Sequence, residues 1–67
     1  MRDIKIDYDA KLNCIEIIGN EKGLKFIADA CLKVIGKDEP GNHFHLMEKM
    51  ENLKPGSVDT TITFVPE

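Results

Sequence analysis

Polar and apolar residues alternate at the start of the chain in the way that is typical of a half-buried β-strand. The alternation runs from Asp3 to Tyr8, and the polar turn Asp9-Ala10 follows it. A second run, from Leu12 to Ile18, is rich in β-branched residues, so the two runs together predict an antiparallel hairpin. On the apolar face of this hairpin we expect Ile4, Ile6, Tyr8, Ile15 and Ile17.

The pattern then changes to helical spacing, and residues at both ends of the segment mark its limits. Asn20 is a favourable N-cap because its side-chain oxygen can accept a hydrogen bond from a free backbone N–H. At the other end, Gly36 suits the left-handed position that follows a helix, and Pro40 prevents continuation. One apolar stripe is formed by Leu24, Ile27, Ala28, Cys31, Val34 and Ile35. The segment therefore predicts a single amphipathic helix.

Two further strand-like runs follow, separated by a polar segment. His43 to Leu46 predicts a short strand, Met47 to Leu53 is a loop or one helical turn, and Val58 to Val65 predicts the closing strand after the turn Pro55-Gly56. The order ββαββ predicts a two-layer α+β fold, with one helix packed on a four-stranded, mainly antiparallel sheet. The sequence does not determine the order of the strands in this sheet. The expected sheet core consists of Ile4, Ile6, Tyr8, Ile15, Ile17, Phe44, Leu46, Ile62 and Phe64.

Length and composition limit the classes of function. The 67 residues allow a single domain, 1–67, which is too small for a nucleotide-binding fold with its crevice. Nine basic residues are scattered among twelve acidic ones, for a net charge of −3, so no nucleic-acid surface is indicated. Because no signal-peptide core and no apolar run of roughly 18 residues is present, we expect a cytoplasmic protein without membrane contact.

Two histidines, His43 and His45, form the most site-like pattern in the chain. At positions i and i+2 of a strand, both imidazoles project from the face opposite the helix, and we expect Cys14 and Glu16 on that same open face. Nitrogen, sulfur and carboxylate oxygen are all ligands of Zn²⁺, so His43, His45 and Cys14 form a candidate metal site. A second paired ligand motif is absent from the sequence. We therefore favour a surface that binds a partner, with no metal and no cofactor.

Catalysis finds little support in the sequence. Cys14 lies in mid-strand, away from the helix start or fixed cation that activates a catalytic thiol, and Cys31 is expected in the core. The carboxylates form no catalytic pair by their spacing. Glu48 and Glu51 instead lie among methionines, a combination that either forms an adaptable recognition surface or closes the core. We expect that the protein is not an enzyme.

Several segments together resemble the small bacterial immunity proteins of polymorphic toxin systems, immunity protein family thirty-two. The similarity extends over residues 12 to 65, and its most specific parts are the His-x-His segment and the Leu-x-Pro-Gly-Ser turn. The segments are Ile15-Glu16-Ile17-Ile18-Gly19-Asn20, Gly23-Leu24, Gly41-Asn42-His43-Phe44-His45-Leu46 and Leu53-Lys54-Pro55-Gly56-Ser57. The resemblance implies a non-enzymatic protein that binds and neutralises a cognate toxin in the cytoplasm of the cell that produces it.

Three interpretations therefore remain open. In the first, a cognate protein toxin binds a surface that contains His43, His45, Glu16, Glu48 and Glu51. In the second, the chain is a small metal-binding protein that uses His43 and His45. In the third, it is a structural domain without catalytic activity, and a second copy covers the open sheet face in a homodimer.

Overall fold

The computed structural model describes residues 3–36 and 39–66. In chain order, its elements are β1 (Ile4–Asp9), β2 (Cys14–Gly19), α1 (Glu21–Gly36), β3 (His43–Leu46), the 3₁₀ turn η1 (Glu48–Met50) and β4 (Thr60–Thr63). The α+β class and the order ββαββ are therefore as predicted, and η1 is the helical turn that was one of two alternatives for its segment.

The first two strands form the predicted antiparallel hairpin, with Ile6 opposite Ile17 and Tyr8 opposite Ile15. Its loop is longer than the sequence indicated, because β2 begins at Cys14. The carboxylate of Asp9 accepts hydrogen bonds from the backbone N–H groups of residues 11 and 12, at 2.9 and 3.3 Å, and so holds a wider turn. Asn13 then closes the loop with a left-handed φ of 50°.

Helix α1 begins as predicted. The side-chain oxygen of Asn20 accepts a hydrogen bond of 2.8 Å from the N–H of Gly23. Gly23 also lets the helix approach β1, because a Cβ atom at this position would lie 2.6 Å from the carbonyl oxygen of Asp3. The expectation for Gly36 was wrong, since this residue still belongs to the helix and its φ is not left-handed.

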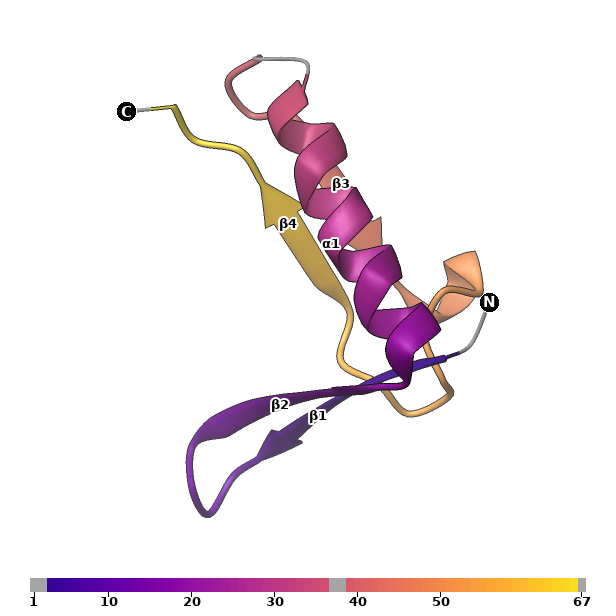
Figure 1. The fold of residues 1–67 in the computed structure, drawn as a ribbon. Coiled ribbons are helices and arrows are strands. Elements are labelled where there is room, and N and C mark those ends of the chain that lie inside the picture. Colours follow the sequence, from indigo (N-terminus) through magenta and orange to yellow (C-terminus); the bar gives the residue numbers. More distant parts are fainter. Residues whose placement is uncertain (1–2, 37–38, 67) are drawn as a thin grey trace.

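The predicted four-stranded sheet is not formed. Instead the strands make two separate antiparallel ribbons, β1–β2 and β3–β4 (Figure 1). The reason lies in an irregular segment, Lys54 to Val58, that occupies the outer edge of β1. The N–H of Lys54 donates to the carbonyl of Ile4 at 2.7 Å, and the N–H of Val58 donates to that of Ile6 at 2.8 Å. These bonds use the edge of β1 that another regular strand would need.

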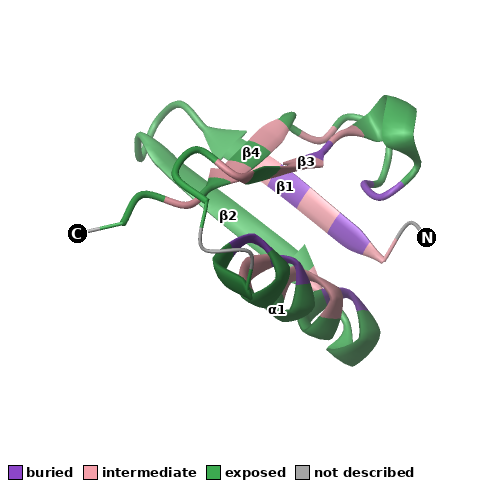
Figure 2. Ribbon diagram, turned by 90° about the horizontal axis from the view of Figure 1, so that it is seen from above, coloured by how far each residue is buried: buried purple, intermediate pink, exposed green. Residues whose placement is uncertain are grey.

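The core lies where the two ribbons meet the helix (Figure 2). Ile4, Ile6, Leu46 and Leu53 are fully buried, and Phe26, Ile27, Phe44 and Ile62 pack against them. Leu53 was not among the predicted core residues. It follows Asn52, which is itself buried and accepts a hydrogen bond from the N–H of Met47 at 2.8 Å while donating one to the carbonyl of His45 at 3.0 Å.

Several residues that were expected in the core are exposed. Tyr8, Ile15 and Ile17 retain 53, 53 and 49% of their accessible surface, because the outer half of the hairpin extends beyond the helix. The helix stripe also differs from the expectation. Its buried positions are Gly23, Ala30 and Val34, with Ile27 and Cys31 half-buried. Three predicted stripe residues, Leu24, Ala28 and Ile35, are exposed.

Candidate functional site

The two histidines lie on the outer face of the β3–β4 ribbon, as the alternation predicted. On the inner face, Phe44 stands opposite Ile62 and packs edge-on against Phe26 of the helix, with ring centroids 5.7 Å apart. The register pairs His43 with Thr63 and His45 with Thr61, so the two threonines share the outer face with the imidazoles. This face is therefore polar, and it is turned away from α1.

The two imidazole rings contact each other, and each forms a hydrogen bond through its Nδ1 atom. Their centroids lie 4.8 Å apart, with an angle of 72° between the planes. Nδ1 of His43 lies 3.0 Å from the carbonyl oxygen of Gly41, and because a carbonyl only accepts, Nδ1 carries the proton of that bond. Nδ1 of His45 lies 3.1 Å from the hydroxyl of Thr61. Nε2, the other ring nitrogen of His43, takes no part in this bond, and the residue is exposed.

The third ligand of the candidate metal site is not brought to this pair. Cys14 and Glu16 belong to the β1–β2 ribbon, where Glu16 stands directly opposite Asp7. Among residues 3–36 and 39–66, no group of three His, Cys, Asp or Glu side chains is placed to hold a metal ion. His43 and His45 by themselves supply two ligands, whereas protein zinc sites use three or four.

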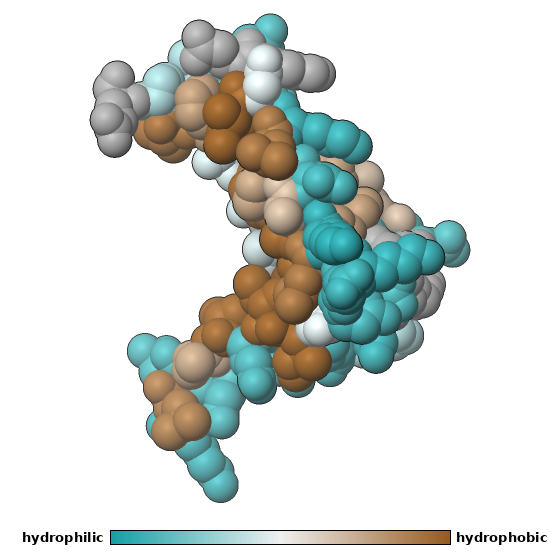
Figure 3. All heavy atoms as spheres, viewed as in Figure 1, coloured by the Kyte–Doolittle hydropathy of each residue, from teal (hydrophilic) through white to brown (hydrophobic). Residues whose placement is uncertain are grey.

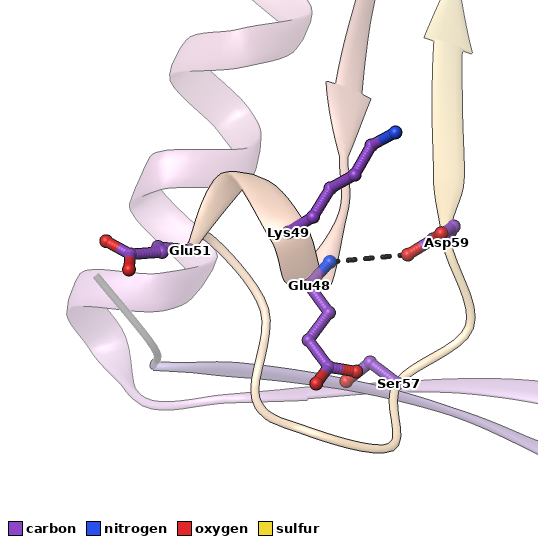
Figure 4. Close-up of a pocket in the computed structure, with 5 residues that line it drawn as sticks. All are labelled: Glu48, Lys49, Glu51, Ser57 and Asp59. Carbon is purple, nitrogen blue, oxygen red and sulfur yellow. Dashed lines mark hydrogen bonds between the residues drawn. The ribbon is translucent and has the colours of Figure 1, made fainter.

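An open acidic cleft of about 500 Å³ lies at the end of the β3–β4 ribbon where Leu46 pairs with Thr60. It is lined by Glu48, Lys49, Glu51, Ser57 and Asp59 (Figure 4). The turn η1 is tied to the neighbouring segment by two bonds, from the N–H of Glu48 to Asp59 at 3.3 Å and from the N–H of Gly56 to the Glu48 carboxylate at 3.3 Å. Figure 4 shows Glu51 and Asp59 on opposite sides of the turn, so the carboxylates form a rim rather than a focused centre.

The structure thus groups some of the predicted partner-binding residues and separates one of them. His43 and His45 are in contact, and Glu48 and Glu51 line the cleft that follows the same strand. Glu16 lies in the other ribbon. Asp59 was missed, because the sequence placed it inside the closing strand, whereas β4 begins only at Thr60 and the segment before it brings Asp59 beside Glu48.

The described residues define a small α+β fold with one helix and two β-ribbons. No helix in the part of the chain that the structure describes is long and apolar enough to cross a membrane. The chain belongs to the family described as Immunity protein 32, whose model matches residues 15–65. This family membership confirms the resemblance and implies a non-catalytic role with a toxin as partner. Neither the curated proteins nor the solved structures that were compared with the chain gave a match.

Proposed function

We propose that this protein binds a cognate bacterial toxin in the cytoplasm and neutralises it without catalysing a reaction. The observation that carries the proposal is the family match, which spans residues 15–65 and so includes α1 and both strands of the β3–β4 ribbon. The net charge of −3 and the carboxylates on the surface favour a toxin with a basic contact surface.

The surface that we assign to the toxin combines the histidine pair with the acidic cleft. His43 offers an exposed ring nitrogen, and Glu48 and Glu51 are exposed on the turn that follows β3. All of these groups are attached to one ribbon, whose inner face is fixed by the Phe26–Phe44 contact. Side chains that already form hydrogen bonds, such as His43 to Gly41 and Glu48 to Gly56, lose less conformational entropy when they bind, which favours recognition by this ribbon. Glu16 is a separate contact candidate, since it projects from the hairpin.

Co-expression tests the proposal. The toxin gene is sought beside the gene of this protein, and growth is measured with the toxin alone and with both proteins. We expect the wild-type chain to restore growth and to form a complex with the purified toxin in calorimetry. If no toxin is found in the locus, or if the chain neither binds nor protects, the proposal is wrong.

The contact surface is tested with variants that remove its polar groups. We expect Glu48→Gln/Glu51→Gln and His43→Ala/His45→Ala each to weaken toxin binding about 10- to 100-fold, as is common for polar contacts in an interface. Glu21→Gln is the control, because Glu21 is an exposed carboxylate in the first turn of α1 that pairs with Lys25 at 3.1 Å. Equal affinities for all these variants would place the toxin on another surface.

A further inference from the structure

The molecule is more open than a monomeric domain of its size. A compact 67-residue chain has a radius of gyration of about 11 Å, whereas the observed value is 12.6 Å. The accessible surface is 4898 Å², compared with about 4,250 Å² for a typical monomer of the same mass. The excess of roughly 650 Å² is close to the ~800 Å² that each partner buries in a standard protein interface.

The excess surface includes an apolar hollow. Figure 3 shows apolar side chains along the concave side of the molecule, between the hairpin and the part formed by the helix and β4. Ile15 and Ile17 lie on the same hairpin face as the buried Ile4 and Ile6, which follows from the strand register. Leu24 continues this surface onto the helix, because its side chain lies 3.3 Å from the position of a Cβ built on Gly19.

The apolar face of α1 is wider than the part of it that the rest of the chain buries. Leu24, Ala28 and Ile35 are spaced by four and seven residues, so they form a second stripe beside the buried one. Leu24 and Ile35 keep 49 and 52% of their surface exposed. We define the concave apolar surface as Tyr8, Ile15, Ile17, Leu24, Ala28 and Ile35.

Strand β2, which borders this surface, has an open edge. In the described part of the chain its only sheet neighbour is β1. The carbonyls of Ile4 and Ile6 point away from β2, toward Lys54 and Val58. Because backbone groups alternate along an antiparallel pair, the N–H groups of Glu16 and Ile18 face β1, whereas those of Ile15 and Ile17 point to the open edge. A six-residue edge strand with one charged residue is a ready template for pairing with another strand.

We propose that a second copy of this chain covers the concave apolar surface, through antiparallel pairing of the two β2 edges in a two-fold dimer. A two-fold contact needs a surface that complements itself, and one copy supplies both an open strand edge and the apolar hollow beside it. The charged hairpin residues Asp7 and Glu16 lie on the opposite hairpin face, so burial of the hollow leaves them solvated. The excess area of two copies reaches the lower end of the range for stable interfaces. The outer histidine face is polar, which makes it a poorer dimer surface than the sequence alone indicated.

Sedimentation equilibrium over a wide range of micromolar concentrations tests the proposal, and it requires no toxin. We expect a reversible dimer with twice the chain mass of 7.5 kDa. Ile17→Lys should raise the dissociation constant at least about 100-fold, since a two-fold axis places the substitution in the interface twice. Met50→Lys is the matched control, because Met50 is 54% exposed but lies in η1, away from the hollow. It should leave the dimer unchanged.

Hydrogen exchange on the wild-type protein gives a test that needs no variant. The amides of Ile15 and Ile17 should become protected as the protein concentration rises, whereas those of Glu16 and Ile18, already bonded to β1, should change little. A wild-type monomer at all concentrations, a dimer that survives Ile17→Lys in folded protein, or unprotected Ile15 and Ile17 amides would overturn the proposal. A monomer in which Ile17→Lys abolishes protection against the toxin would assign this surface to the toxin instead.

Discussion

Gly23 provides a sharp test of how the helix is packed against β1. In an exposed helix, replacement of glycine by alanine stabilises the fold by about 1 kcal/mol, because it reduces the freedom of the unfolded chain. At Gly23 the new Cβ would lie 2.6 Å from the carbonyl oxygen of Asp3 and 3.0 Å from the side chain of Ile4. Both neighbours are held in place, one as backbone and the other as a fully buried core residue. Such overpacking costs about 1–3 kcal/mol. After subtraction of the gain of about 1 kcal/mol, we expect Gly23→Ala to lower the free energy of unfolding by up to about 2 kcal/mol.

Gly36→Ala is the matched control in the same helix. Apart from its chain neighbours and the backbone of its own helix, no atom of the described residues lies within 4 Å of a Cβ built on Gly36, and its φ is compatible with alanine. We expect this variant to be unchanged or to gain about 0.5 kcal/mol. Urea unfolding followed by far-ultraviolet circular dichroism, at one fixed protein concentration, measures both variants. A difference of about 2 kcal/mol corresponds to a gap of roughly 8–16 °C in Tm for a domain of this size. If Gly23→Ala stabilises the protein as much as Gly36→Ala does, the close approach of α1 to β1 is wrong.

Three further predictions concern the polar groups. Asn52→Ala should lower the free energy of unfolding by about 2 kcal/mol in the same urea assay, because it leaves the N–H of Met47 and the carbonyl of His45 without their buried partner. Asn20→Ala should cost about 1 kcal/mol through loss of the helix cap, whereas Asn20→Ser should keep most of that stability. Elemental analysis of purified protein should find far less than one zinc per chain, and stoichiometric zinc that is lost in His43→Ala/His45→Ala would contradict the two-ligand geometry.

Local features of the fold were readable from the sequence because neighbouring residues determine them. The cap at Asn20 and the turn at Pro55-Gly56 are formed as predicted, with a φ of 83° at Gly56 and a 3.2 Å bond that closes the turn from Ser57 to Lys54. The period of two also placed the histidines opposite Phe44, because alternate side chains of a strand must lie on opposite faces. The family resemblance was likewise visible in these local segments.

The tertiary structure decided which apolar faces are covered. Alternation assigned Ile15 and Ile17 to the same face as Ile4, but it contains no information on how far the helix reaches along the hairpin. The division into two ribbons depends on Lys54 and Val58, which are about fifty residues from the strand edge that they occupy. Pairings between such distant segments are chosen by the packing of the whole chain, and no local pattern encodes them. The sequence therefore determined the elements and their faces, whereas the tertiary structure alone showed that one large apolar surface stays exposed.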